Sequence, residues 1–322
     1  MRGARIFAAA LGAVGALAAA GLAAPALAAP RLVVRNAAVS LVVQPEDRSD
    51  IAVQVWRPNA HLPLQVTRQG ADVVIDGHLL SLLTSCHGSG DGLHVLAVGH
   101  GDFGVAQMPQ VLAHVPMDAV VEAGGIVHGA VARSRNLTLG ASGCGDWTVG
   151  NVAGHLDASA SGVGSLRTGS ARSAEVSLSG TGHVSVGQVQ TQLVARLSGA
   201  GSLAVRAAGA ADVSISGSGD LTTGPIAGPL GARLSGAGNL KVESVEGPVT
   251  AEVSGIGNVM IAGGHAPSLS AHVSGTGSIR FEGVADALDA DVSGVGSVNV
   301  ARVTGSINQR VSGVGSVHVG GR

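Results

Sequence analysis

Four side chains capable of acid–base chemistry occupy one recurring position near the C-terminal end of this chain. They are Glu252, His272, Asp291 and Arg310, at steps of 19 or 20 residues. Two carboxyl groups on one face could cleave a glycosidic bond if their separation suited the reaction. The alternative is a row of alternating surface charges, in which each pair contributes roughly a few tenths of a kcal/mol. The chain has no Tyr and two Trp to stack sugar rings, so we interpret this row as a surface ladder and expect no catalytic residues.

A second group, His87, His94 and His100 with Asp91, has the residue types of a zinc site. The surrounding stretch 84–106 is rich in Gly, His and Ser and is typical of a loop, with one strand over 93–98. Exposed loop histidines are commonly solvated. We therefore expect neither a bound metal nor a cofactor.

Gly-rich repeats that contain Asp can bind calcium when almost every turn supplies a carboxylate. In this chain the position after the second Gly of each repeat is acidic only at Asp146 and Asp220. The other copies carry Ser, His or Asn there. Two acids in ten repeats cannot build a series of calcium sites, so this row is interpreted as a solvated polar ladder.

Cys86 and Cys144 are the two cysteines of the chain, and they do not form a C-x-x-C motif. An even cysteine count in an exported protein favours a disulfide. Closing a loop of this length would stabilise the fold by roughly 4 kcal/mol on the chain-entropy model. Two buried free thiols are the alternative.

The charged row and the residues after the second Gly must be positioned by a repeat whose signature is Ser-Gly-x-Gly. Ten copies begin at Ser142, Ser161, Ser179, Ser198, Ser216, Ser235, Ser254, Ser274, Ser293 and Ser312. Neighbouring copies lie 18 to 20 residues apart. Such a steady period indicates one structural unit per repeat, stacked on its neighbours.

Within each repeat, apolar and polar residues alternate in the way that a half-buried strand requires. The residue before each Ser is always apolar, and the residue before that is mostly polar or charged. Short strands broken by Gly turns every 19 residues predict an all-β fold, a right-handed parallel β-helix. The glycines would turn each corner, either because stacked corners leave no room for a Cβ or because φ is positive there. The serines would hydrogen-bond their own turn or the next coil.

The chain divides into three parts. Residues 1–28 carry Arg2 and Arg5, an apolar run and an A-x-A site, the pattern of a signal peptide. Residues 29–122 contain irregular strands and are expected to form a β-rich cap with the first coils, because solenoids need capped ends. Residues 123–322 form the regular β-helix. The last coil shows no capping segment, so self-association through that coil is expected.

Composition excludes several classes of protein. Net charge is −2 and no basic block is present, whereas a nucleic-acid-binding surface needs clustered positive charge. After the leader no stretch reaches the length of a transmembrane helix. Aromatic residues make up 2% of the chain, so small aliphatic side chains must fill the core.

The Ser-Gly-x-Gly ladder and the segment Gly143 to Val152 resemble a bacterial envelope family, the head GIN domain of auto-transporter adhesins. The resemblance covers about residues 31–320. It implies an exported β-helical protein and supplies no catalytic residues to carry over.

We therefore expect a non-enzymatic protein of the periplasm or cell surface that acts as an adhesion or protein-interaction module. Its partner would be a protein or another envelope component. The alternative is a polysaccharide-active enzyme, a lyase or hydrolase, on the same scaffold; a purely structural envelope protein is a third possibility.

Overall fold

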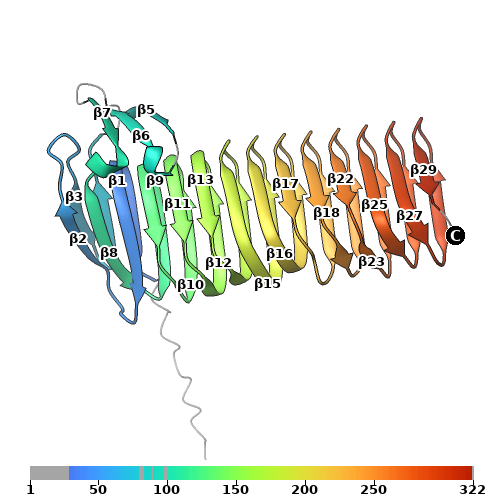
Figure 1. Cartoon of the computed structure of the whole chain (residues 1–322), viewed down its shortest axis with the longest axis horizontal. Helices are drawn as coiled ribbons and strands as arrows, with labels where there is room; N and C mark the ends of the chain where they lie inside the picture. The colour runs from blue at the N-terminus through green and yellow to red at the C-terminus, as the bar shows by residue number, and fades with distance from the viewer. Residues whose placement is uncertain (1–28, 80–82, 89, 98–100, 321–322) are drawn as a thin grey trace, which may run out of the picture.

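The computed structural model describes residues 29–79, 83–88, 90–97 and 101–320. These residues form a rod of stacked β-coils, with a small separate sheet beside its N-terminal end (Figure 1). The signal peptide expected over 1–28 lies outside the described residues. Within the described ranges, no helix combines the length and the apolar character needed to cross a membrane.

Strands dominate the secondary structure from end to end. The N-terminal part contains β1 (Arg31–Glu46), β2 (Ala52–Arg57), β3 (Gln65–Gln69), β4 (Asp72–Asp76), β5 (Leu83–His87), β6 (His94–Ala97), β7 (Gly101–Gly104), β8 (Gln110–Pro116) and β9 (Asp118–Val131). Two short 3₁₀ turns, η1 (Gly90–Gly92) and η2 (Val105–Gln107), lie among them.

The middle of the rod contains β10 (Asn136–Ala141), β11 (Cys144–Val149), β12 (Val152–Ala160), β13 (Val163–Thr168), β14 (Ala171–Leu178), β15 (His183–Leu197), β16 (Ser202–Ile215), β17 (Asp220–Thr223), β18 (Leu230–Leu234) and β19 (Asn239–Val242). The C-terminal part contains β20 (Val245–Glu246), β21 (Val249–Val253), β22 (Asn258–Ile261), β23 (Gly264–Ala266), β24 (Leu269–Val273), β25 (Ser278–Ala285), β26 (Leu288–Val292), β27 (Ser297–Val303), β28 (Ile307–Val311) and β29 (Ser316–Val319).

Equivalent residues of successive repeats pair in parallel, one coil above the next. The residue before the corner Ser shows this register, since Leu234 pairs with Val253, Val253 with Val273 and Val273 with Val292. The described residues make about 11 turns, spaced about 19 residues apart. The parallel β-helix predicted from the repeat is confirmed.

The core is a narrow column of small aliphatic side chains. In β21, for example, Val249, Ala251 and Val253 are buried while Thr250 and Glu252 point outward. Phe281 is the largest fully buried side chain. Burying one Val or Leu contributes about 1.5–3 kcal/mol, and the period-two alternation repeats this burial in coil after coil, so the column holds the rod together.

The corner serines act mainly through their backbone. In all ten corners the Ser N–H donates to a backbone carbonyl of the coil before it. The acceptor is the apolar residue that precedes the corner Ser in that coil, and for the first corner it is the residue at the equivalent position. The Ser254 N–H, for instance, lies 2.8 Å from the Leu234 oxygen. Hydroxyl bonds to the same carbonyl occur at Ser142 and Ser254. The ten Ser side chains are exposed, so most of the hydroxyls remain on the surface.

Crowding explains the corner glycines. A Cβ built on Gly255 would lie 2.0 Å from the carbonyl oxygen of Gly236, and one on Gly257 would lie 2.0 Å from that of Gly238. Neither Gly255 nor Gly257 has a left-handed φ. Lack of space therefore explains Gly255 and Gly257, and a positive φ does not. In the first two corners both reasons apply, since Gly145 (φ 140°) and Gly164 (φ 146°) have a positive φ and are crowded as well.

Parallel coils begin inside the segment 29–122. Strand β1 pairs in parallel with β4, β8 and β9. Strands β2 and β3 then pair antiparallel with β8 and β4. These two added strands occupy the edge of the first coil, and a covered edge prevents further pairing at that end.

Candidate functional site

The outward charged residues of the C-terminal coils form one continuous row. Strand register places Arg233 beside Glu252, Glu252 beside His272, His272 beside Asp291, and Asp291 beside Arg310. The four residues singled out from the sequence are therefore neighbours in space. Arg233 extends the row by one coil.

This row lines an open groove together with the exposed corner serines. The residues that define the polar groove are Arg233, Glu252, His272 and Asp291 with Ser214, Ser235, Ser254, Ser274, Ser293 and Ser312. Leu234, Val253 and Val273 also line the groove, and Arg310 lies just beyond it.

Contacts within the groove are loose and partly solvated. The Arg233 guanidinium lies 3.5 Å from a Glu252 carboxylate oxygen and 3.4 Å from that of Asp212. Nε2 of His272 lies 2.9 Å from the Ser270 hydroxyl. The Arg233 and Glu252 side chains are 59% and 48% exposed. Such a surface offers many donors and acceptors to a partner, while water retains access to each.

In the groove, Glu252 lacks the water-poor surroundings that the acid of a glycosidic cleavage requires. Glu252 and Asp291 lie two coils apart, which puts their backbones roughly 10 Å from each other. That reaction also needs one carboxyl group kept protonated by a water-poor environment. Glu252 is about half exposed and already paired with Arg233. The arrangement suits recognition of a polar surface better than bond cleavage.

The residues that follow the second corner Gly form a hydrogen-bonded ladder. The Asn239 amide donates to Asp220 at 2.8 Å, the Asn258 amide donates to Asn239 at 3.0 Å, and the Ser278 hydroxyl donates to Asn258 at 2.7 Å. These side chains satisfy one another between coils. Their polar groups are thereby used in holding the stack together.

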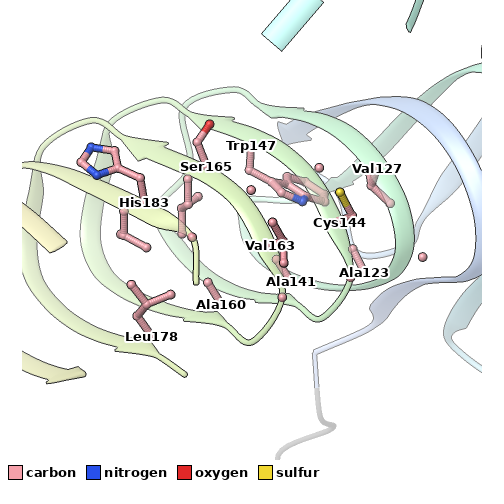
Figure 2. A pocket seen from close by; sticks show the side chains of 18 residues that line it. Ala123, Val127, Ala141, Cys144, Trp147, Ala160, Val163, Ser165, Leu178 and His183 are labelled. Atoms are coloured by element: carbon pink, nitrogen blue, oxygen red, sulfur yellow. The ribbon is translucent and has the colours of Figure 1, made fainter. Parts of the chain in front are cut away.

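A small cavity lies under the corners of the first repeats (Figure 2). Ala141 and Ala160 stand where later repeats carry Leu, Ile or Val before the corner Ser. The space left is about 30 Å³, and the buried ring of Trp147 lines it. A single water needs about 10–15 Å³ of such space, so this cavity is too small for an organic ligand.

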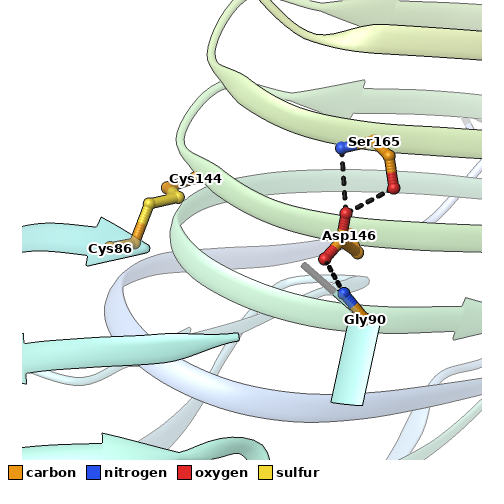
Figure 3. The surroundings of a disulfide bond; sticks show 5 residues. All are labelled: Cys86, Gly90, Cys144, Asp146 and Ser165. Carbon is orange, nitrogen blue, oxygen red and sulfur yellow. Dashed lines mark hydrogen bonds between the residues drawn. A yellow bond between two sulfur atoms is a disulfide. The ribbon is translucent and has the colours of Figure 1, made fainter. Parts of the chain in front are cut away.

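Strands β5, β6 and β7 form a separate antiparallel sheet attached to the rod (Figure 1). A disulfide joins Cys86 on β5 to Cys144 at the first corner, with Cα atoms 6.4 Å apart. Asp146 is 5% exposed and accepts hydrogen bonds from the Gly90 N–H and from the Ser165 N–H and hydroxyl (Figure 3). The sheet is therefore fixed to the solenoid both covalently and through a buried carboxylate.

This sheet brings together part of the histidine group that the sequence analysis interpreted as solvated loop residues. His87 and His94 face each other across β5 and β6. His100 and the side chain of Asp91 lie outside the described residues. The carboxylate beside the two imidazoles is that of Asp102 on β7. Sequence reasoning missed Asp102 because the stretch was interpreted as a loop, in which cross-strand neighbours cannot be assigned.

Three of the carboxyl groups whose pKa is lowered, Asp72, Asp76 and Asp118, lie in the N-terminal coils, and a fourth, Asp286, lies in the C-terminal coils beside His265. The pKa of Asp72 is lowered by hydrogen bonds from the backbone and then the side chain of Arg31. The pKa of Asp118 is lowered by hydrogen bonds from Arg135 and then Asn136. These are surface ion pairs between neighbouring coils, outside the polar groove. Their perturbation reflects stacking of the coils and does not mark a catalytic group.

Comparison with protein families gives one match. The family described as "Putative auto-transporter adhesin, head GIN domain" matches residues 94–224 and 227–322. No curated protein matches the chain. The family match spans the polar groove and begins at His94, whereas the resemblance in the sequence was expected from about residue 31.

Proposed function

The chain belongs to the head GIN domain family of adhesin-like proteins, and on this basis we propose that it is a non-enzymatic, exported envelope protein that binds a partner along its polar groove. The observation that carries the proposal is the strand register that aligns Arg233, Glu252, His272 and Asp291. A rigid row of this kind can present matched charges to a protein or another envelope component. Export would use the signal peptide expected over 1–28.

The corners whose serines line the groove favour a protein as the partner. Ile256, Val295 and Val314 occupy the x position of the corner Ser-Gly-x-Gly and are 64%, 62% and 85% exposed. Apolar side chains beside polar ones suit protein contacts, in which apolar groups lose water while charges set orientation. A glycan would instead favour aromatic platforms, and the chain has few aromatic residues.

The absence of enzyme activity is part of the proposal and rests on the groove. Of its two carboxylates, Glu252 is about half exposed and pairs with Arg233, and Asp291 is partly exposed. An enzyme acting on polysaccharides through this groove would depend on Glu252 and Asp291. Any such activity that survived in the Glu252→Ala/Asp291→Ala double variant would exclude these residues as its catalytic groups.

Site-directed photocrosslinking in intact producing cells tests the binding face. A photoreactive residue at Ser254 or Ser293 is expected to give one discrete adduct, which mass spectrometry identifies. Lys241, on the outward face of β19, serves as the control position and should give none. The charge reversal Glu252→Arg should remove the adduct. Equal adducts from Ser254 and Lys241, or adducts unaffected by the reversal, would refute the groove as the binding face.

We also propose self-association through the C-terminal coil. Val311 is 46% exposed, whereas its counterpart Val292 in the preceding coil is fully buried. Among the described residues, β28 and β29 pair with β26 and β27 on one side, and an open strand edge favours pairing with another chain. Light scattering should show a mass that rises with concentration. A monomeric mass at high concentration would count against this contact.

A further inference from the structure

The outer face of the β5–β6–β7 sheet brings together three metal-ligand side chains. They are His87, His94 and Asp102, whose ligand atoms all lie within 4.8 Å of one another. The two imidazole rings stack with centroids 5.6 Å apart and planes inclined by 21°. Nδ1 of His94 lies 3.4 Å from Oδ2 of Asp102. Each ligand comes from a different strand.

Strand alternation explains why the three side chains share a face. Cys86, Val95 and Phe103 belong to the apolar cluster between the sheet and the rod. Their neighbours in sequence, His87, His94 and Asp102, therefore point to the opposite side.

Gly104 lies opposite His94 in the β6–β7 pair. Because Gly104 has no side chain, the space around the His94 ring stays open. A Cβ at Gly104 would approach the ring to 3.6 Å.

The backbone beneath this face is held firmly. The residue before His87 is Cys86, which is disulfide-bonded to Cys144. The η1 turn between β5 and β6 is tied to Asp146 through the Gly90 N–H. Val95 and Ala97 of β6 are fully buried. Side-chain rotation alone would then bring the ligands together, so little ordering of the backbone would oppose binding.

The spacing is close to what a tetrahedral ion needs. Zinc bonds to imidazole nitrogen and carboxylate oxygen are about 2.0–2.2 Å long, which places ligand atoms about 3.3–3.5 Å apart. The His94–Asp102 separation of 3.4 Å already meets this value. The ligand atom of His87 lies within 4.8 Å of those of His94 and Asp102, so it has to approach them by about 1.5 Å at most. Its ring is exposed and free of core packing, so it can make this movement.

We propose that His87, His94 and Asp102 bind a divalent transition-metal ion of the zinc class, with water as the fourth ligand. Two imidazoles and a carboxylate are a donor set that zinc accepts and that calcium and magnesium do not favour. The bound ion would clamp β5, β6 and β7 together at the surface, opposite the side that the disulfide secures. This inference is independent of the polar groove and its partner.

Isothermal titration of zinc chloride into the oxidised protein without its leader tests the site. One zinc per chain should bind at micromolar concentration, and magnesium chloride should give no heat. His87→Ala and His94→Ala should each weaken binding by at least about tenfold, and Asp102→Asn should weaken it as well. These side chains are about half exposed or more, so the variants should keep the circular dichroism spectrum of the parent.

A matched control comes from another His–Asp pair on the surface. His265 Nε2 lies 3.0 Å from Asp286 with similar exposure, and within the described part of the chain no third ligand residue joins this pair. His265→Ala should leave zinc affinity unchanged. The proposal fails if the parent protein gives no heat up to millimolar zinc. It fails equally if the His87→Ala/His94→Ala double variant retains the parent affinity.

Discussion

Replacing Gly255 by Ala should destabilise the coils around β21 and β22 strongly. The added Cβ would lie 2.0 Å from the Gly236 carbonyl oxygen, 2.7 Å from that of Ser235 and 2.9 Å from the Gly236 carbonyl carbon. Ordinary contact begins near 3.4 Å, so the two coils would have to separate by more than 1 Å. All three obstructing atoms belong to the backbone, and no side chain can rotate away to relieve the clash.

Separation of the coils sets the size of the effect. It would break the hydrogen bonds from the Ser254 N–H to Leu234, at 2.8 Å, and from the Ile256 N–H to Gly236, at 3.1 Å. Each contributes about 1 kcal/mol net, and overpacking strain adds about 1–3 kcal/mol. We expect a loss of about 3–5 kcal/mol in the free energy of unfolding of these coils.

Gly231→Ala is the matched control. A Cβ there would meet Asp212 at 3.5 Å, an ordinary contact, and φ is not left-handed. Its effect should stay within about 0.5 kcal/mol or be slightly stabilising.

Guanidinium unfolding followed by circular dichroism would compare the two Gly variants. Because solenoids can unfold coil by coil, hydrogen exchange over residues 230–275 would locate the damage. Equal unfolding midpoints and equal exchange in the two variants would refute the crowding argument.

Three further outcomes follow from the N-terminal half. Asp146→Asn should release the β5–β7 sheet locally at a cost of about 1–3 kcal/mol, because an amide cannot accept all three hydrogen bonds; unchanged hydrogen exchange in that sheet would contradict this. Gly129→Ala should displace the Trp147 ring, which would lie 2.3 Å from the new Cβ, and shift its fluorescence to the red; an unchanged spectrum would count against the packing described. Asp72 and Asp118 have lowered pKa values, so the stability they contribute is complete above about pH 4 and is lost as pH falls through their folded-state pKa. The N-terminal coils should then lose exchange protection in acid before the middle coils, and loss in the reverse order would disprove this.

Much of the candidate site was predictable because a strict repeat converts sequence distance into spatial distance. Glu252, His272 and Asp291 share one repeat position, so the stacking of coils makes them neighbours. The groove that they line with the corner serines was not predictable, because its depth depends on how each corner projects beside the sheet. Asp102 was missed for a related reason, since the stretch around it has no repeat to set its register.

The architecture of this protein follows from its repeat. A 19-residue period and two-residue alternation admit few folds besides stacked parallel coils, and the apolar position before each Ser defines the core. How the corners work became clear from the folded structure, because the contacts between coils cannot be read from one repeat. Those contacts place a carbonyl oxygen where a corner Cβ would lie. They make the Ser N–H the donor to the preceding coil in every corner, with the hydroxyl adding a bond only at Ser142 and Ser254 among the corner serines. They also bring Cys86 to Cys144 and His87 to His94, since only packing of the small sheet against the rod fixes which residues meet.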